Sequence, residues 1–228
     1  MELIETKLDH LQGRVLDMVR LVKSQVQKSK DALFNKDEAL ADAVILADEE
    51  VDEADVKINQ NCEQILALFN PVAIDLRVIL TSIKISLSLE RIGDHAEGIC
   101  YSFKEIPEDF NPAHLEALKI SEMFETAETM LEDFSQALKN KDLKLAKSIY
   151  KKDRFLNKAY AKSVKTAVKL IKQDVAEANT ILQLLSVVRK IERMGDLTKN
   201  MSLEVIFHLT GKFPNRKPKG KKKKKSSE

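Results

Sequence analysis

Residues 90–94 read ERIGD and residues 192–196 read ERMGD, so nearly the same five letters stand twice in the chain. In each copy one acid precedes another by four residues, with a glycine just before the second acid. Because an α-helix has about 3.6 residues per turn, acids at this spacing lie on one helical face. The repetition indicates two related halves, each carrying an acid pair.

The composition favours long helices around this motif. The 228 residues include only six Gly, five Pro and no Trp, and 43% of them are hydrophobic, which is enough for an ample core. Apolar residues recur at three- and four-residue steps, as in Leu8, Leu11, Val15 and Met18, the stripe of an amphipathic helix. We therefore expect an all-α chain.

The breaks between apolar stripes predict six helices in two sets of three, the first from about Leu3 to about Phe34. Pro71 is expected at the first position of a helix. The predicted division is 1–106, 107–211 and a tail at 212–228. The breaks are Asn35 to Asp37, Asn70-Pro71, Pro107 to Pro112, Asn140 to Asp142, Gln173-Asp174 and Gly211 to Pro214.

Counting outward from the turns aligns acids on neighbouring helices. In an antiparallel pair joined by a short turn, residues that lie abreast have numbers with a constant sum. Around Asn70-Pro71 this places Asp48 beside Asp94 and Asp52 beside Glu90. The first half is thus expected to gather four carboxylates.

The same counting applies to the second half, where the turn lies near Asp174. Asp153 then lies beside Asp196, and Asn157 lies beside Glu192. The geometry of the first half is repeated, with one amide in place of a carboxylate.

Carboxylates gathered in this way repel one another, so a compensating positive charge is expected. Oxygen ligands without His or Cys suit Mg²⁺, Mn²⁺, Ca²⁺ or iron better than a structural zinc. The first candidate is therefore a metal cluster. The alternative is that Arg91, Arg189 and Arg193 neutralise the acids in surface ion pairs.

Enzyme chemistry is poorly supported by these motifs. A di-iron oxidase bundle uses Glu-x-x-His, whereas Gly93 and Gly195 stand at the third position after each Glu. Either glycine could leave room for an ion or ligand, or allow tight helix packing. A metal-assisted phosphohydrolase stays open as a less favoured alternative, because no general base is evident.

The end of the chain is strongly basic. From Arg216 to Glu228 it holds eight basic residues and one acid, while the whole chain has a net charge of +2. Such a run is expected to be disordered. It could tether the protein to nucleic acid or anionic lipid, but the lack of interleaved aromatics favours a solubilising role. We expect no nucleic-acid partner and at most peripheral contact with a membrane.

The compartment is expected to be the cytoplasm. The first residues are charged, and no apolar run approaches the ~18 residues of a membrane span. Cys62 and Cys100 lack a C-x-x-C spacing and are expected to be free, packed thiols.

Residues 70–99, NPVAIDLRVILTSIKISLSLERIGDHAEGI, closely resemble the signature of the PhoU family, regulatory proteins of bacterial phosphate transport. Residues 189–200, RKIERMGDLTKN, resemble the second repeat of that family. The resemblance covers nearly the whole body of the chain. It implies two tandem three-helix bundles with metal-binding E-x-x-x-D motifs, in a non-enzymatic negative regulator of phosphate uptake and signalling.

Together with the carboxylate donors, the resemblance implies divalent or multinuclear metal ions of iron, manganese or magnesium as cofactors. The candidate ligands are Glu90, Asp94, Glu192 and Asp196, with Asp48, Asp52 and Asp153 as facing partners. Asn157 departs from the acidic pattern. Since an amide can offer a metal only its carbonyl oxygen, we expect the second site to be weaker or to use fewer ions.

The partners implied by the resemblance are the ATPase subunit of the phosphate ABC transporter and a phosphate-sensing histidine kinase. Two alternatives remain, an accessory protein of a permease-type phosphate transporter and a purely structural helical scaffold. Helices with apolar stripes on two faces also permit a homodimer.

Overall fold

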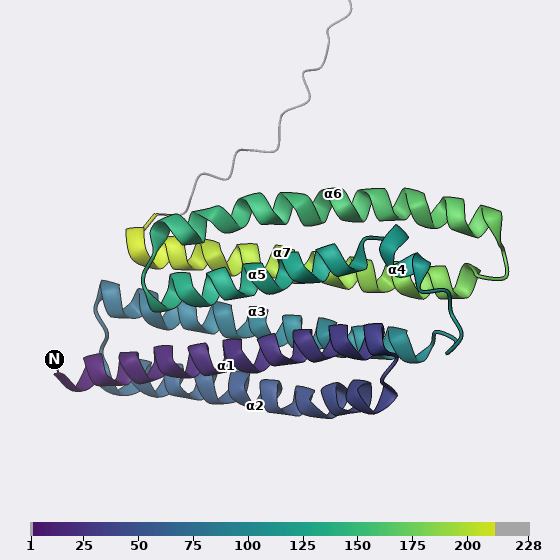
Figure 1. Ribbon diagram of the computed structural model, residues 1–228. Helices are drawn as coiled ribbons and strands as arrows, with labels where there is room; N and C mark the ends of the chain where they lie inside the picture. Colours follow the sequence, from purple (N-terminus) through teal and green to yellow (C-terminus); the bar gives the residue numbers. More distant parts are fainter. Residues whose placement is uncertain (1, 213–228) are drawn as a thin grey trace, which may run out of the picture.

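The computed structural model describes residues 2–212, and this part of the chain is all-α, as predicted (Figure 1). It contains seven helices where the sequence predicted six. They are α1 (Glu2–Asn35), α2 (Glu38–Phe69), α3 (Ala73–Lys104), α4 (Ala113–Ala117), α5 (Ile120–Lys139), α6 (Leu143–Gln173) and α7 (Ala178–Thr210).

The long helices form two three-helix bundles that lie side by side. α1, α2 and α3 pack together as the first bundle, and α5, α6 and α7 as the second. Helix α3 packs along α7 and α1 touches α5, so α2 and α6 lie on the outer sides (Figure 1). The two copies of the motif are carried by the central helices α3 and α7.

The buried apolar side chains form one continuous core that includes residues of all seven helices. On α3 the inner face, with Ile85, Leu89 and Ile92, is almost fully buried. Leu80 and Leu87, which lead along α3 toward the first motif, are 43% and 46% exposed. The acids of α3 thus continue an exposed side of the helix, whereas the opposite side holds the bundle together.

The additional helix is α4, which follows the predicted break at Pro107 to Pro112. Lys119 separates it from α5 by adopting a left-handed conformation, with φ of 61°. The first helix of the second bundle is therefore only 20 residues long. The prediction of six helices was wrong because a single turn of helix has no periodic apolar stripe from which it could be predicted.

The other helix ends follow the predicted breaks. The side chains of Asp37 and Asp142 accept hydrogen bonds from the backbone N–H groups that open α2 and α6. The prediction for Pro71 was wrong, because α3 begins two residues later at Ala73. The left-handed Asn70 ends α2, and Pro71 lies in the connection before the N-cap residue Val72.

Cys62 and Cys100 are both free and buried, as predicted. Within residues 2–212, no helix is long and apolar enough to cross a membrane. The domain boundary near residue 106 stays a prediction. The predicted disordered tail lies, apart from Lys212, outside the described residues.

Candidate metal centres

The first acidic site lies between α2 and α3. We use this name for five carboxyl side chains, Asp48, Asp52, Glu90, Asp94 and Glu97. Helix α2 supplies the first two and α3 the other three. The pKa of Asp48 is raised to about 6, chiefly by burial, while a hydrogen bond from Gln25 opposes the rise and the carboxylates of Glu97, Asp94 and Asp52 add to it.

The other α3 carboxyls respond in the same direction. Burial raises the pKa of Glu90, and the carboxylates of Asp94 and Asp52 raise it too. Burial also raises the pKa of Asp94 and of Glu97, with Asp52 adding to the first and Asp94 to the second. The predicted neighbours therefore lie close enough to disfavour one another's ionisation, which a cation between them would reverse.

A pair of oxygens from two helices lies over Gly93. The side-chain N–H of Gln25 on α1 donates to Asp48 Oδ1 over 3.3 Å. Gln25 is only 4% exposed, and its own Oε1 has no hydrogen-bond partner in the described part of the chain. A Cβ on Gly93 would lie 2.9 Å from Asp48 Oδ1 and 3.0 Å from Gln25 Oε1. The glycine leaves space for two oxygens, one of them buried and unpaired.

These oxygen donors are of the type that hard cations prefer, but their side chains do not converge on one point. Among residues 2–212, no three His, Cys, Asp or Glu side chains converge closely enough to hold a metal ion as they stand. Asp52 and Asp94 are exposed, so their side chains have space to rotate. No Lys or Arg of the described residues forms an ion pair with the first acidic site. Arg91 lowers the pKa of Glu90 and Asp94, but burial and the neighbouring carboxylates outweigh it, so both pKa values are raised.

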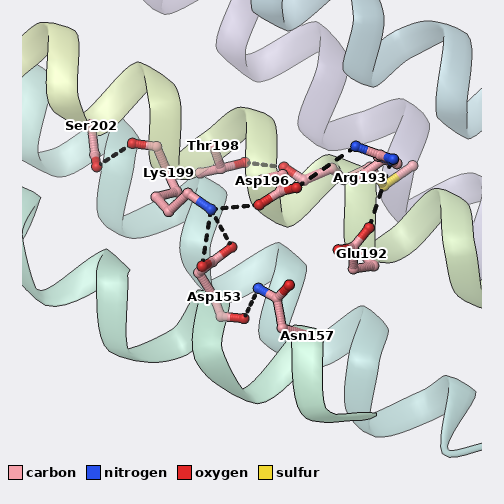
Figure 2. A network of polar contacts seen from close by, with 9 residues as sticks. Asp153, Asn157, Glu192, Arg193, Asp196, Thr198, Lys199 and Ser202 are labelled. Carbon is pink, nitrogen blue, oxygen red and sulfur yellow. Dashed lines mark hydrogen bonds and ion pairs between the residues drawn. The ribbon is translucent and has the colours of Figure 1, made fainter. Parts of the chain in front are cut away.

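The second acidic site lies between α6 and α7 and comprises Asp153, Glu192 and Asp196. Here a lysine contacts two of the three carboxylates, those of Asp153 and Asp196, as Figure 2 shows. Lys199 Nζ lies 3.0 Å from both carboxylate oxygens of Asp153 and also donates to Asp196 Oδ1. Asp153 is 6% exposed, so this is a buried, charge-assisted contact that joins the two helices.

Burial lowers the pKa of Lys199, but its hydrogen bonds with Asp196 and Asp153 outweigh that effect and raise the pKa above its ordinary value. The ammonium is therefore charged at neutral pH. Burial raises the pKa of Asp153, and Lys199 opposes the rise. Burial likewise raises the pKa of Glu192, together with Asp196, while Arg193 opposes it.

Arg193 and Asn157 also form their polar contacts within this site. Arg193 Nε lies 3.8 Å from Glu192 Oε2, and Arg193 Nη1 lies 3.9 Å from Asp196 Oδ2. The Asn157 amide donates to the backbone carbonyl of Asp153 over 2.9 Å, back along its own helix (Figure 2). The alternative of ion-paired acids, weighed from the sequence, thus describes this second site.

Besides Gln25 of α1, the sequence reasoning missed two residues of the central helices, Glu97 and Lys199. When ERIGD is aligned with ERMGD, both stand three residues after the final Asp, one turn further along the helix. Extending the comparison of the two copies by one turn would have found them. The position is an acid in the first repeat and a base in the second.

The two motif glycines also differ in what they approach. A Cβ on Gly195 would lie only 2.2 Å from Leu156 Cδ1, so this glycine permits close packing of α7 on α6. Gly93 instead faces oxygens. Of the two roles predicted for these glycines, helix packing applies to Gly195, and room for polar groups applies to Gly93.

Two stretches, residues 15–103 and 120–205, match the PhoU domain. This chain belongs to the PhoU family. The resemblance read from residues 70–99 and 189–200 is confirmed, and the matched stretches coincide with the bodies of the two bundles.

PhoU relatives align over nearly the full length. The phosphate-specific transport system accessory protein PhoU of Serratia marcescens is 32% identical over 206 residues, covering 90% of this chain and 84% of that protein. A PhoU homologue from Clostridium acetobutylicum is 29% identical, over 92% of this chain and 96% of its own length.

Two PhoU crystal structures share the fold. The phosphate transport system regulatory protein PhoU from Streptococcus pneumoniae superposes with a TM-score of 0.84, at 26% identity, over 93% of this chain and 99% of that one. PhoU from Pseudomonas aeruginosa gives a TM-score of 0.87, also at 26% identity, over 91% and 99%.

Proposed function

We propose that this chain is a cytoplasmic, non-enzymatic accessory protein of bacterial phosphate uptake that binds metal ions at its first acidic site. The observation that carries the proposal is the PhoU match across both bundles, with relatives named as accessory or regulatory proteins of phosphate transport. Those names support regulation rather than catalysis.

The proposed regulatory partners are the ATPase subunit of a phosphate ABC transporter and a phosphate-sensing histidine kinase. By binding both, the protein would report the state of the transporter to the kinase and restrain uptake and signalling. The outer helices α2 and α6 lie on opposite sides of the described part of the molecule, so two partners would not compete for the same helix (Figure 1).

Metal binding is proposed for the first acidic site because its donors suit a hard cation. Asp48, Asp52, Glu90 and Asp94 would hold iron, manganese or magnesium, and Gln25 Oε1 is a further oxygen without a partner among residues 2–212. A bound cation neutralises carboxylates that otherwise raise one another's pKa. Because the donors come from two helices, it would also fasten α2 to α3.

The metal proposal is tested on full-length protein purified without a metal-affinity tag. Metal content and thermal melting are measured before and after chelation, and after adding back Mn²⁺ or Mg²⁺. We expect Asp48→Asn with Asp94→Asn to abolish both the bound metal and the gain in melting temperature. The control is Glu50→Gln with Glu63→Gln, which removes two exposed acids of α2 outside the site. Metal content that survives the first pair of substitutions contradicts the ligand assignment.

The partner proposal is tested by crosslinking and pull-down in a bacterium that has both types of phosphate transporter. Recovery of the ABC transporter's ATPase subunit and of the sensor kinase is expected. Recovery of the permease-type transporter alone would assign the protein to the alternative group of accessory proteins.

A further inference from the structure

The second acidic site already contains a cation of its own. The Lys199 ammonium lies between carboxylates from two helices, within hydrogen-bonding distance of three oxygens, two from Asp153 and one from Asp196 (Figure 2). A metal ion that bridged α6 and α7 would need these same oxygens. The ammonium therefore occupies the position that the repeat geometry assigns to a metal.

The contacts around Lys199 favour the observed position of its ammonium group. Asp153 is 6% exposed, and withdrawing the ammonium would leave that buried carboxylate without its partner. The Asn157 amide is bonded to its own helix, and Arg193 adds a second positive charge beside Glu192 and Asp196. An incoming divalent cation would meet two positive charges and fewer acidic ligands than in the first repeat.

The same position in the first repeat has the opposite sign. Glu97 aligns with Lys199, and its carboxylate raises the pKa of Asp48 instead of neutralising it. The first acidic site thus gathers five carboxylates, and no Lys or Arg in residues 2–212 is ion-paired with them. The residue one helical turn beyond the motif is thus Glu97 in the first site, where it adds negative charge, and Lys199 in the second site, where it provides the positive charge.

We propose that Lys199 is a permanent internal substitute for the metal in the second repeat, and that it confines divalent-metal binding to the first repeat. This inference rests on the proposed function, because it concerns how the PhoU metal chemistry is divided between the two repeats. It also sets aside Asp153, Glu192 and Asp196 as metal ligands in this chain.

The experiment isolates the second site in full-length protein that carries Asp48→Asn and Asp94→Asn. The chelated protein is titrated with Mn²⁺, and free Mn²⁺ is counted by electron paramagnetic resonance. No binding is expected in this background. Adding Lys199→Met should create Mn²⁺ binding, at least about tenfold tighter than the detection limit that the background protein sets, because Asp153 and Asp196 then lack their cation.

The matched control is Lys190→Met. Lys190 is a half-buried lysine of the same helix whose ammonium contacts the hydroxyls of Ser102 and Ser186 and, within residues 2–212, no carboxylate. It should create no Mn²⁺ site. Thermal melting gives a second readout: Lys199→Met should lower the melting temperature in chelator and regain it with Mn²⁺, whereas Lys190→Met should show no recovery.

Two results would overturn the inference. One is Mn²⁺ binding in the background protein that disappears on Asp153→Asn, since the second site would then bind metal with Lys199 in place. The other is a folded Lys199→Met protein with no gain in Mn²⁺ binding. Where Lys199→Met does not fold, Lys199→Gln keeps two N–H donors without the charge and gives the same comparison. Absence of metal from the unsubstituted protein would count against the proposed function alone, because the second site is measured separately.

Discussion

The two acidic sites have a similar arrangement of residues but differ in whether a positive side chain offsets the repulsion between their carboxylates. In both, a central helix presents Glu and Asp four residues apart against acids of an outer helix. In the first site no Lys or Arg of residues 2–212 is ion-paired with the carboxylates, which raise one another's pKa. In the second site Lys199 is ion-paired with Asp153 and Asp196, and Arg193 lies beside Glu192. An internal repeat can thus keep its geometry while its two copies differ in the charge of the groups around the acids.

Exchanging the charge at the first site should have the largest effect. Glu97→Lys places an ammonium one turn beyond Asp94, as Lys199 stands beyond Asp196, and should weaken Mn²⁺ binding at the first site by about 100-fold or more. Titration of the chelated protein measures this. Glu97→Gln, which only removes one charge, should cost about tenfold or less. Equal Mn²⁺ affinity in Glu97→Lys and the parent would show that this position does not distinguish the sites.

The pH dependence of stability should reveal the uncompensated first site. Asp48 has a pKa of about 6 in the folded protein and of about 3.9 in an unfolded chain, so the folded state binds more protons between these values. In chelator, the melting temperature should therefore fall as pH rises from about 4 to about 6, and this contribution should level off above that.

Asp48→Asn is the variant that tests the assignment of this pH dependence. It removes the carboxyl but keeps the size of the side chain, so the fall in melting temperature over this range should become smaller. An identical pH profile in parent and variant would place the titrating groups elsewhere in the protein.

Substitutions of the two motif glycines should distinguish a role in helix packing from a role in metal binding. Gly195→Ala puts a methyl group against the buried Leu156 and should destabilise the protein by about 1–3 kcal/mol, from urea unfolding. Gly93→Ala meets first the ends of Asp48 and Gln25 and, at 3.3 Å, Val51 Cγ1, so its main effect should be on Mn²⁺ affinity.

Gly13→Ala is the control for helix propensity in this series. It lies within α1 with nothing within 4 Å of the new methyl group, and it should stabilise the protein by up to about 1 kcal/mol. A destabilisation by Gly195→Ala no larger than that of Gly93→Ala would remove the proposed difference between the glycines.

The smallest effect is expected from restoring the missing acid of the second site. Asn157→Asp makes the second site match the acidic pattern of the first, but Lys199 still occupies the carboxylates of Asp153 and Asp196. Mn²⁺ titration in the background that lacks the first site should detect no new binding. New, tight binding in this variant would show that Asn157, rather than Lys199, is what keeps metal out.

The sequence by itself determined the helical class, most helix ends and the pairing of the acids. These follow from local rules, because apolar periodicity and capping residues such as Asp37 and Asp142 act within a few residues of where they stand. The rise per residue is nearly constant, so counting from the turns brought Asp153 to Asp196 without knowledge of the packing. The short α4 was missed because one turn of helix leaves no pattern.

Only the tertiary structure decided which acids are neutralised and by what. Arg91 and Arg193 occupy the same position in the two motifs, yet only Arg193 forms ion pairs with the acids beside it, among the contacts of residues 2–212. Whether Lys199 reaches Asp153 depends on how closely α7 approaches α6, which Gly195 and Leu156 set through packing. Charge and spacing are properties of the sequence. The balance between burial and a neighbouring charge arises only where two helices meet, because both effects act across space between residues far apart in the chain.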